Sequence, residues 1–82
     1  MGRRYMTLDE LPVGKTATIL AVGGENTLRL RLLDMGLIPR TQVKMQKLAP
    51  LGDPMEFRVR GYELTLRKED ARHITIEEVK QT

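Results

Sequence analysis

The chain has 82 residues, no cysteine and a formal net charge of +3. A chain of this length forms one domain and buries only about 60–65% of its unfolded surface. The absence of cysteine excludes disulfides and thiolate metal sites, and it fits a reducing compartment. Phe57, Tyr5 and Tyr62 are the only aromatic residues, so we expect an aliphatic core. The predicted domain covers residues 1–82, with an ordered core over about residues 7–78.

The hydrophobic segments are too short to cross a membrane. The longest uninterrupted apolar run, residues 19–22, falls far short of the ~20 residues that span a bilayer. Residues 1–4 are basic, but no apolar stretch follows them, so they do not form a secretory signal. Met6 stands where N-myristoylation needs Ser or Thr. We therefore expect a soluble, cytoplasmic protein.

The first predicted element is one turn of helix. Thr7 and Glu10 have the spacing of a capping box, and residues 1–6 show no periodic pattern, so we expect those residues to fray. Residues 15–22 then alternate as a strand. The apolar positions on one face of this strand are Ala17, Ile19 and Ala21.

The second element is a helix. Asn26 or Thr27 can cap it, and it is expected to run to about Met35, where Gly36 stops it. At about 100° per residue, its apolar stripe consists of Leu28, Leu32 and Met35, with Leu33 beside them. Leu30 falls on roughly the opposite side, so we expect it to point outward.

From Gln42 onward the apolar residues recur with a period of two, which is typical of strands. Residues 49–54 predict a tight turn, Gly61 predicts a hairpin turn, and residues 68–71 predict a single helical turn or loop. The last strand precedes a polar tail, residues 77–82. The positions that we expect to face the core are Val43, Met45, Met55, Phe57, Val59, Leu64, Leu66, Ile74 and Ile76.

These elements amount to about five short strands with one helix inserted between the first and the second. A sheet of this size, with one apolar face and no second layer of helices, is best protected when it curls into a closed or nearly closed barrel. The sequence therefore predicts an all-β fold, a small SH3-like barrel of about five strands with one short inserted helix.

The order and spacing of several short motifs resemble those of the FeoA family. The resemblance runs from about residue 8 to residue 76. Four pieces carry it: Leu8 and Leu11 followed by Gly14, Ala17 and Ile19; residues 32–37 (LLDMGL); residues 49–54 (APLGDP); and Gly61 followed by Leu64 and Leu66-Arg67. Members of this family are small cytosolic partners of bacterial ferrous-iron transporters, and the same domain occurs at the C-terminus of iron- and manganese-dependent repressors.

The resemblance implies an SH3-like barrel and a role in iron uptake. On this reading the protein docks on the cytosolic G-protein or membrane part of the transporter and modulates it. The chain departs from the family at Arg40, where Gly usually follows Pro39, so we expect a type I turn there rather than type II. It also departs at Leu30, a helix position that is usually polar.

The candidate partner-binding residues lie on the helix and in the Pro- and Gly-rich turn. An outward Leu30 between Arg29 and Arg31 has the pattern of an interface anchor with a charged rim. A single exposed leucine is also ordinary on protein surfaces. Leu51 and Asp53, in the turn, form the second candidate surface.

The sequence assigns no catalytic, cofactor-binding or metal-ligating residue. His73, Glu77 and Glu78 are of types that ligate iron, but a single histidine without preorganised partners is more often an exposed surface residue. An Asx turn explains Asp53. The chain contains no Ser or Cys and no carboxylate pair placed by a recognisable motif, so we expect a protein that is not an enzyme.

A nucleic-acid-associated or metal-dependent-repressor-type barrel is the alternative, because small barrels of this kind also bind RNA and the chain is basic. A nucleic-acid footprint needs basic residues clustered on one face. Here Arg58 shares its strand face with Glu56, and Arg67 lies close to Glu69. A chain of 82 residues also leaves no room for a winged helix. We expect no nucleic-acid partner and no membrane insertion, and the sequence leaves self-association open.

Overall fold

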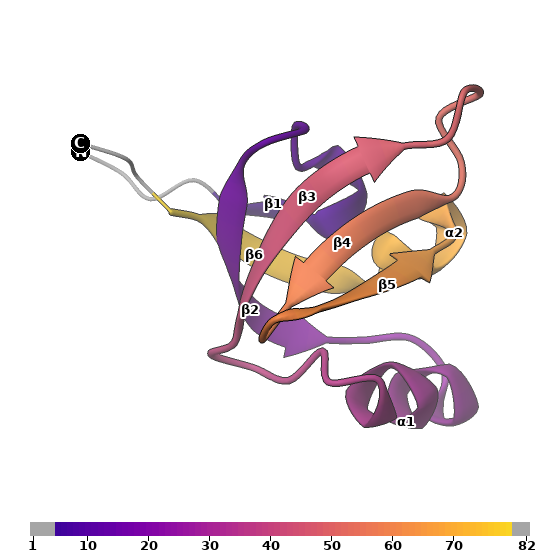
Figure 1. The fold of residues 1–82 in the computed structure, drawn as a ribbon. Helices are drawn as coiled ribbons and strands as arrows, with labels where there is room; N and C mark the ends of the chain where they lie inside the picture. Colours follow the sequence, from indigo (N-terminus) through magenta and orange to yellow (C-terminus); the bar gives the residue numbers. More distant parts are fainter. Residues whose placement is uncertain (1–4, 80–82) are drawn as a thin grey trace.

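Six antiparallel strands form one sheet in the order β1-β6-β2-β3-β4-β5. The computed structural model describes residues 5–79 (Figure 1). The expectations for residues 1–4 and for the last three residues of the tail lie outside this range. In chain order the elements are β1 Tyr5–Thr7, the 3-10 turn η1 Leu8–Glu10, β2 Thr16–Val22, α1 Asn26–Asp34, β3 Gln42–Leu48, β4 Met55–Val59, β5 Tyr62–Leu66, α2 Lys68–Ala71 and β6 Ile74–Glu78.

The sheet curls around an aliphatic core. Figure 1 shows β1 and β6 behind β3, β4 and β5, and Phe57 is fully buried between them with Met55 and Val59. The buried residues are Leu8, Leu11, Ala17, Ile19, Val22, Leu32, Leu37, Val43, Met45, Met55, Phe57, Val59, Leu66, Ala71, Ile74 and Ile76. The predicted core positions from β3 to β6 are thus confirmed, apart from Leu64, which is only partly buried.

Residues 5–7 form a sixth strand, although the sequence predicts that residues 1–6 fray. Tyr5 pairs with Glu77 and Met6 with Ile76, so β6 extends to Glu78, into what the sequence predicts as a polar tail. Three residues are too few to show the alternation of apolar and polar residues that is typical of a strand. Their strand conformation depends instead on pairing with the edge of β6. The helical turn that follows is confirmed, with the Thr7 backbone N–H donating to Glu10 Oε1 at 3.1 Å.

A bulge changes the direction of the side chains at the end of β2. The register of β2 against β6 shifts between Ile19 and Ala21. An extra residue in one strand interrupts the alternation beyond it. Val22 therefore enters the core and Ala21 is exposed, so the expectation that Ala21 faces inward is wrong.

The helix α1 begins at Asn26 with Glu25 as its N-cap, so neither predicted cap, Asn26 or Thr27, is correct. The Glu25 carbonyl accepts the Arg29 N–H at 2.8 Å, and no side chain caps the helix. Leu32 is fully buried. The rest of the predicted stripe, Leu28, Leu33 and Met35, packs partly buried against the core. The stripe is therefore confirmed, while the cap is not.

The turn after α1 is type II, so the expected type I turn is wrong. Arg40 has φ 77°, and the Thr41 N–H donates to the Ile38 carbonyl at 3.1 Å. Pairing with β2 fixes the backbone of this turn. The Arg40 N–H donates to the Ile19 carbonyl at 2.6 Å, and the Ile19 N–H donates to the Thr41 carbonyl at 2.9 Å. Tertiary hydrogen bonds therefore place a non-glycine residue in the left-handed region.

The strands β4 and β5 form the hairpin that Gly61 predicts. Its two-residue turn has positive φ at both positions, 50° at Arg60 and 87° at Gly61, as in the mirror-image turns that suit tight hairpins. The register pairs Val59 with Tyr62 on either side of the turn. No helix among residues 5–79 is long and apolar enough to cross a bilayer.

Candidate functional site

Leu30 lies on the outer side of α1, as the sequence predicts, with 53% of its surface exposed. The flanking guanidiniums point to different parts of the molecule. Arg29 Nε donates to the Val22 carbonyl at the end of β2 at 3.2 Å. Arg31 Nη2 lies 3.4 Å from Asp70 Oδ2 in α2. Both predicted rim residues are therefore tethered to the body of the protein.

The C-terminal end of α1 is fixed to β5 by a tyrosine. The Tyr62 hydroxyl donates to the Met35 carbonyl at 2.5 Å. Gly36 has φ 97°, and a Cβ at this position would collide with that hydroxyl. Gly36 thus both ends the helix and leaves room for Tyr62. The sequence indicates the first role, but it gives no signal for the second, because the two residues belong to different elements.

The turn between β3 and β4 is tied by its own backbone. The Gly52 N–H donates to the Ala49 carbonyl at 2.7 Å, and the Ala49 N–H donates to Pro54 at 3.1 Å. Leu51 is 95% exposed in this turn, which extends beyond the ends of the two strands (Figure 1). The predicted tight turn therefore presents a leucine to solvent on a hydrogen-bonded backbone.

Asp53 does not form the Asx turn that the sequence predicts. Its Oδ1 accepts the backbone N–H of Lys68 at 3.0 Å, 15 residues along the chain. Lys68 is the first residue of α2, and the first N–H groups of a helix lack partners within the helix. The carboxylate therefore fastens the β3–β4 turn to the start of α2. Local sequence does not reveal an acceptor supplied from so far away.

A hollow of about 440 Å³ is lined by residues of α1, β5, α2 and the β3–β4 turn. Its lining residues are Arg31, Met35, Pro54, Thr65, Leu66, Arg67 and Asp70. Of the five predicted partner-binding residues, Arg31 lines the hollow. Leu30 precedes Arg31 on α1, and Asp53 precedes Pro54. Arg29 and Leu51 are not among the lining residues. The structure thus places parts of α1 and of the turn around one depression.

The remaining lining residues were missed by the sequence reasoning. Thr65, Leu66 and Asp70 come from β5 and α2, and only folding brings them to α1. Leu66-Arg67 belongs to the family pattern, which is the only signal available in the sequence. The walls carry two guanidiniums and one carboxylate, and Arg67 forms no ion pair within residues 5–79. The hollow therefore has a positive balance of charge.

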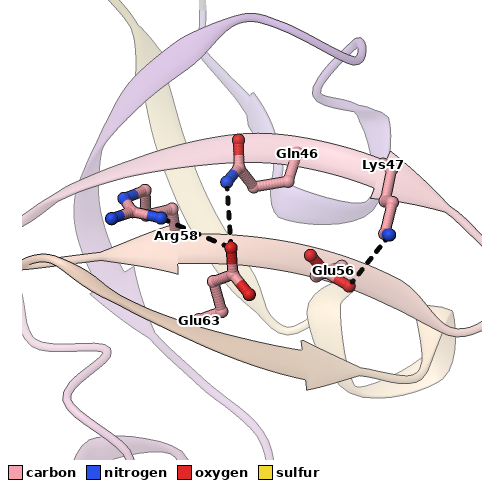
Figure 2. A network of polar contacts seen from close by, with 5 residues as sticks. All are labelled: Gln46, Lys47, Glu56, Arg58 and Glu63. Atoms are coloured by element: carbon pink, nitrogen blue, oxygen red, sulfur yellow. Dashed lines mark hydrogen bonds and ion pairs between the residues drawn. The ribbon is translucent and has the colours of Figure 1, made fainter.

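The outer face of β3, β4 and β5 carries a different, balanced set of charges (Figure 2). Glu63 Oε2 accepts from Arg58 Nη1 at 3.3 Å and from Gln46 Nε2 at 3.4 Å. Lys47 Nζ lies 4.0 Å from Glu56 Oε1. Arg58 and Lys47 each have a carboxylate neighbour on this face, so the face is a mixed surface of the kind that the sequence predicts.

The residues weighed as metal ligands lie apart from the hollow. His73 is exposed just before β6, and Glu77 and Glu78 belong to that strand. Across residues 5–79, no three His, Cys, Asp or Glu side chains are grouped so that they would hold a metal ion.

Known proteins match this chain in sequence and in structure. The model of the FeoA domain matches residues 6–78. A Porphyromonas gingivalis protein described as an Fe(2+) transport protein A/Fe(2+) transporter FeoB fusion protein is 39% identical over 72 residues. The match covers 88% of this chain but only 8% of that relative, so this chain spans a small part of the fusion protein.

Two solved structures share this architecture over most or all of the chain. An FeoA-like protein from Clostridium acetobutylicum superposes with a TM-score of 0.87 at 30% identity, covering 100% of this chain and 94% of that one. The zinc complex of Stenotrophomonas maltophilia FeoA, described as a procaryotic SH3 domain protein, gives 0.76 at 27% identity, covering 87% and 88%. The SH3-like fold is thus confirmed, and the chain belongs to the FeoA domain family.

Proposed function

We propose that this protein is a regulatory binding module of a ferrous-iron transporter and acts by docking on the cytosolic part of that transporter. The observation that carries the proposal is the Porphyromonas gingivalis relative, in which a region similar to this chain is fused to FeoB. Two modules on one chain meet at a high effective concentration, which favours a direct contact between them.

The α1 side of the molecule is the docking surface that the geometry supports best. Leu30 is a large exposed side chain on the outer side of α1, and the side chain of Arg31, which lines the hollow, is 60% exposed. An apolar anchor surrounded by charged groups is the usual composition of a protein–protein interface. The module acts there as a cytoplasmic binding protein that modulates its partner without catalysing a reaction.

Calorimetric titration tests the proposal. The purified protein is titrated with the soluble cytosolic G-protein domain of the ferrous-iron transporter from the same organism, with and without guanine nucleotide. Saturable binding in either nucleotide state supports the proposed function. If that domain fails to bind in both states while an oligonucleotide binds with a steep salt dependence, the nucleic-acid alternative is correct instead.

A further inference from the structure

The strand β5 has a free outer edge. It pairs with β4 only, because it ends the sheet. The two-residue hairpin turn makes Val59 and Tyr62 a hydrogen-bonded pair, and such pairs alternate along an antiparallel ladder. The backbone groups of Glu63 and Thr65 therefore point away from β4. No backbone hydrogen bond to them comes from loops or turns within residues 5–79, so this edge can still pair with another strand.

The hollow lies against this edge. Thr65 is exposed on the outer face of β5, whereas Leu66 is buried on the core face, and both residues line the hollow. Because these two residues belong to opposite faces of β5, the hollow lies beside the edge of the strand and not over one face. Met35 and Pro54 also line the hollow. A strand added to β5 would therefore place alternate side chains close to the apolar residues of the hollow.

The two edges of the sheet differ in what they offer. Exposed edges in natural proteins are commonly short or interrupted by proline, which discourages pairing with other chains. The other edge strand, β1, has three residues, whereas β5 has five residues and contains no proline. The longer edge is also the one beside the hollow, so β5 is the edge suited to pairing.

The charges around the hollow indicate which kind of segment would bind at the β5 edge. Arg67 has no ion-pair partner within residues 5–79, and Arg31, paired with Asp70, remains 60% exposed. Lys68 follows Arg67 at the start of α2 and is exposed. Complementary charge across an interface steers association and disfavours partners of the wrong sign. The surroundings of the β5 edge thus favour a segment that carries carboxylates.

We propose that the β5 edge binds an extended, acidic segment of a partner protein, which pairs with the backbone of Glu63 and Thr65 as a seventh strand. Main-chain hydrogen bonds supply affinity in this mode of recognition, and side-chain pockets supply specificity. The inference rests on the proposed function insofar as the transporter is the source of the segment. The edge itself can be tested without the transporter.

A pair of synthetic peptides provides that test. One is a capped pentapeptide of alternating aspartate and valine, and its control replaces each aspartate with lysine. In ¹⁵N–¹H correlation spectra, the acidic peptide should shift the amides of Glu63, Thr65 and Arg67 and slow the hydrogen exchange of Thr65. The lysine peptide should bind at least fivefold more weakly. Absence of β5 shifts at millimolar acidic peptide, or equal binding of the two peptides, overturns the inference.

Substitutions at Thr65 separate the backbone from the side chain. Thr65→Pro removes the outward N–H, and proline is tolerated on an edge strand where that group faces solvent. Thr65→Ala keeps the N–H. We expect at least tenfold weaker binding of the acidic peptide by the proline variant and less than a twofold change in the alanine variant. Equal loss in both variants would assign binding to the side chain and contradict strand pairing.

A charge reversal keeps the test decisive if Thr65→Pro does not fold. Arg67→Glu should weaken binding of the acidic peptide and strengthen binding of the lysine peptide. Lys44→Glu makes the same change in net charge at an exposed position of β3 and should change the affinity for either peptide by no more than about twofold. Equal effects of the two reversals would show that net charge alone acts and would overturn the assignment to the hollow.

The soluble cytosolic domain of the transporter distinguishes this inference from the proposed function. Binding that Thr65→Pro weakens and Thr65→Ala spares supports both. Binding that neither variant changes overturns strand pairing but leaves the proposed function intact. Failure of that domain to bind, with the acidic peptide still bound at β5, contradicts the proposed function alone. A dimer of the free protein that Thr65→Pro dissociates would make a second copy the occupant and overturn the inference.

Discussion

The Tyr62 hydroxyl donates a hydrogen bond to the Met35 carbonyl and thereby joins the end of α1 to the edge strand β5. Tyr62→Phe removes this bond, so we expect the free energy of unfolding to fall by about 0.5–1.5 kcal/mol. The amides at the end of α1 should also exchange faster with solvent. Tyr5→Phe is the control, because the Tyr5 hydroxyl has no partner within residues 5–79. Equal effects of the two changes in denaturant titrations would show that the bond does not hold the helix.

Arg40 carries backbone strain that glycine would relieve. A non-glycine residue in the left-handed region costs roughly 1–2 kcal/mol of folding free energy, which glycine would avoid. Glycine also raises the entropy of the unfolded chain, and this offsets part of the stability gained. Arg40→Gly should therefore raise the free energy of unfolding by about 0.5–1 kcal/mol in urea titrations. Arg60→Gly is a contrasting variant, since Arg60 also has positive φ but donates to Thr41 Oγ1 at 3.2 Å. It should gain less.

Phe57 anchors the core from the middle of β4. It is fully buried and is the only phenylalanine. Phe57→Ala should reduce the free energy of unfolding by about 3–5 kcal/mol, a large share of the stability of so small a domain. Calorimetry should show a correspondingly lower melting temperature, and Phe57→Leu should lose much less. A melting temperature for Phe57→Ala within a few degrees of the unchanged protein would contradict the packing of β4.

Asp53 fastens the β3–β4 turn to α2. Asp53→Ala leaves the Lys68 N–H without its carboxylate acceptor, so we expect a loss of about 1 kcal/mol in the free energy of unfolding. Asp53→Asn retains an acceptor oxygen and should recover most of that loss. If asparagine is as destabilising as alanine in thermal melts, the negative charge and not the hydrogen bond supports α2.

Leu30 is the predicted anchor for the transporter. Leu30→Glu should leave the melting temperature nearly unchanged, because the side chain faces solvent. It should weaken binding to the soluble transporter domain by roughly 1–3 kcal/mol. Arg31→Ala should act mainly on the association rate and its salt dependence, as rim charges do.

Val13 supplies a matched control for this prediction. It is also 53% exposed, and it lies in the segment between η1 and β2, which Figure 1 shows far from α1. Val13→Glu introduces the same charge and should leave the affinity unchanged. Unchanged affinity in Leu30→Glu would place docking elsewhere, most simply at the β3–β4 turn.

The sequence predicts those parts of the fold that depend on local pattern. The alternation through Met55, Phe57 and Val59 and the apolar stripe of α1 need only the period of each element. The parts it misses depend on pairing between distant residues. Nothing near Tyr5 marks it as a strand until β6 is beside it, and nothing near Arg40 indicates positive φ until β2 pairs with it.

The candidate site follows the same division. Leu30 and Arg31 are recognisable from their positions on a helix, and the APLGDP turn is recognisable from its residue types. The hollow between them is invisible in the sequence, because its walls come from α1, β5, α2 and the turn. Thr65 in particular has no distinguishing neighbour. Its role depends on which way its backbone faces, which only the register of the hairpin determines.

The pairing of Tyr5 with Glu77 means that the chain enters and leaves the barrel through adjacent strands. Figure 1 shows this point on the side away from α1 and the β3–β4 turn. A neighbouring domain attached before β1 or after β6 would therefore connect to the same region of the barrel. Both attachment points lie away from α1 and the β3–β4 turn, so a fusion at either end of the domain starts at a distance from the candidate docking surfaces.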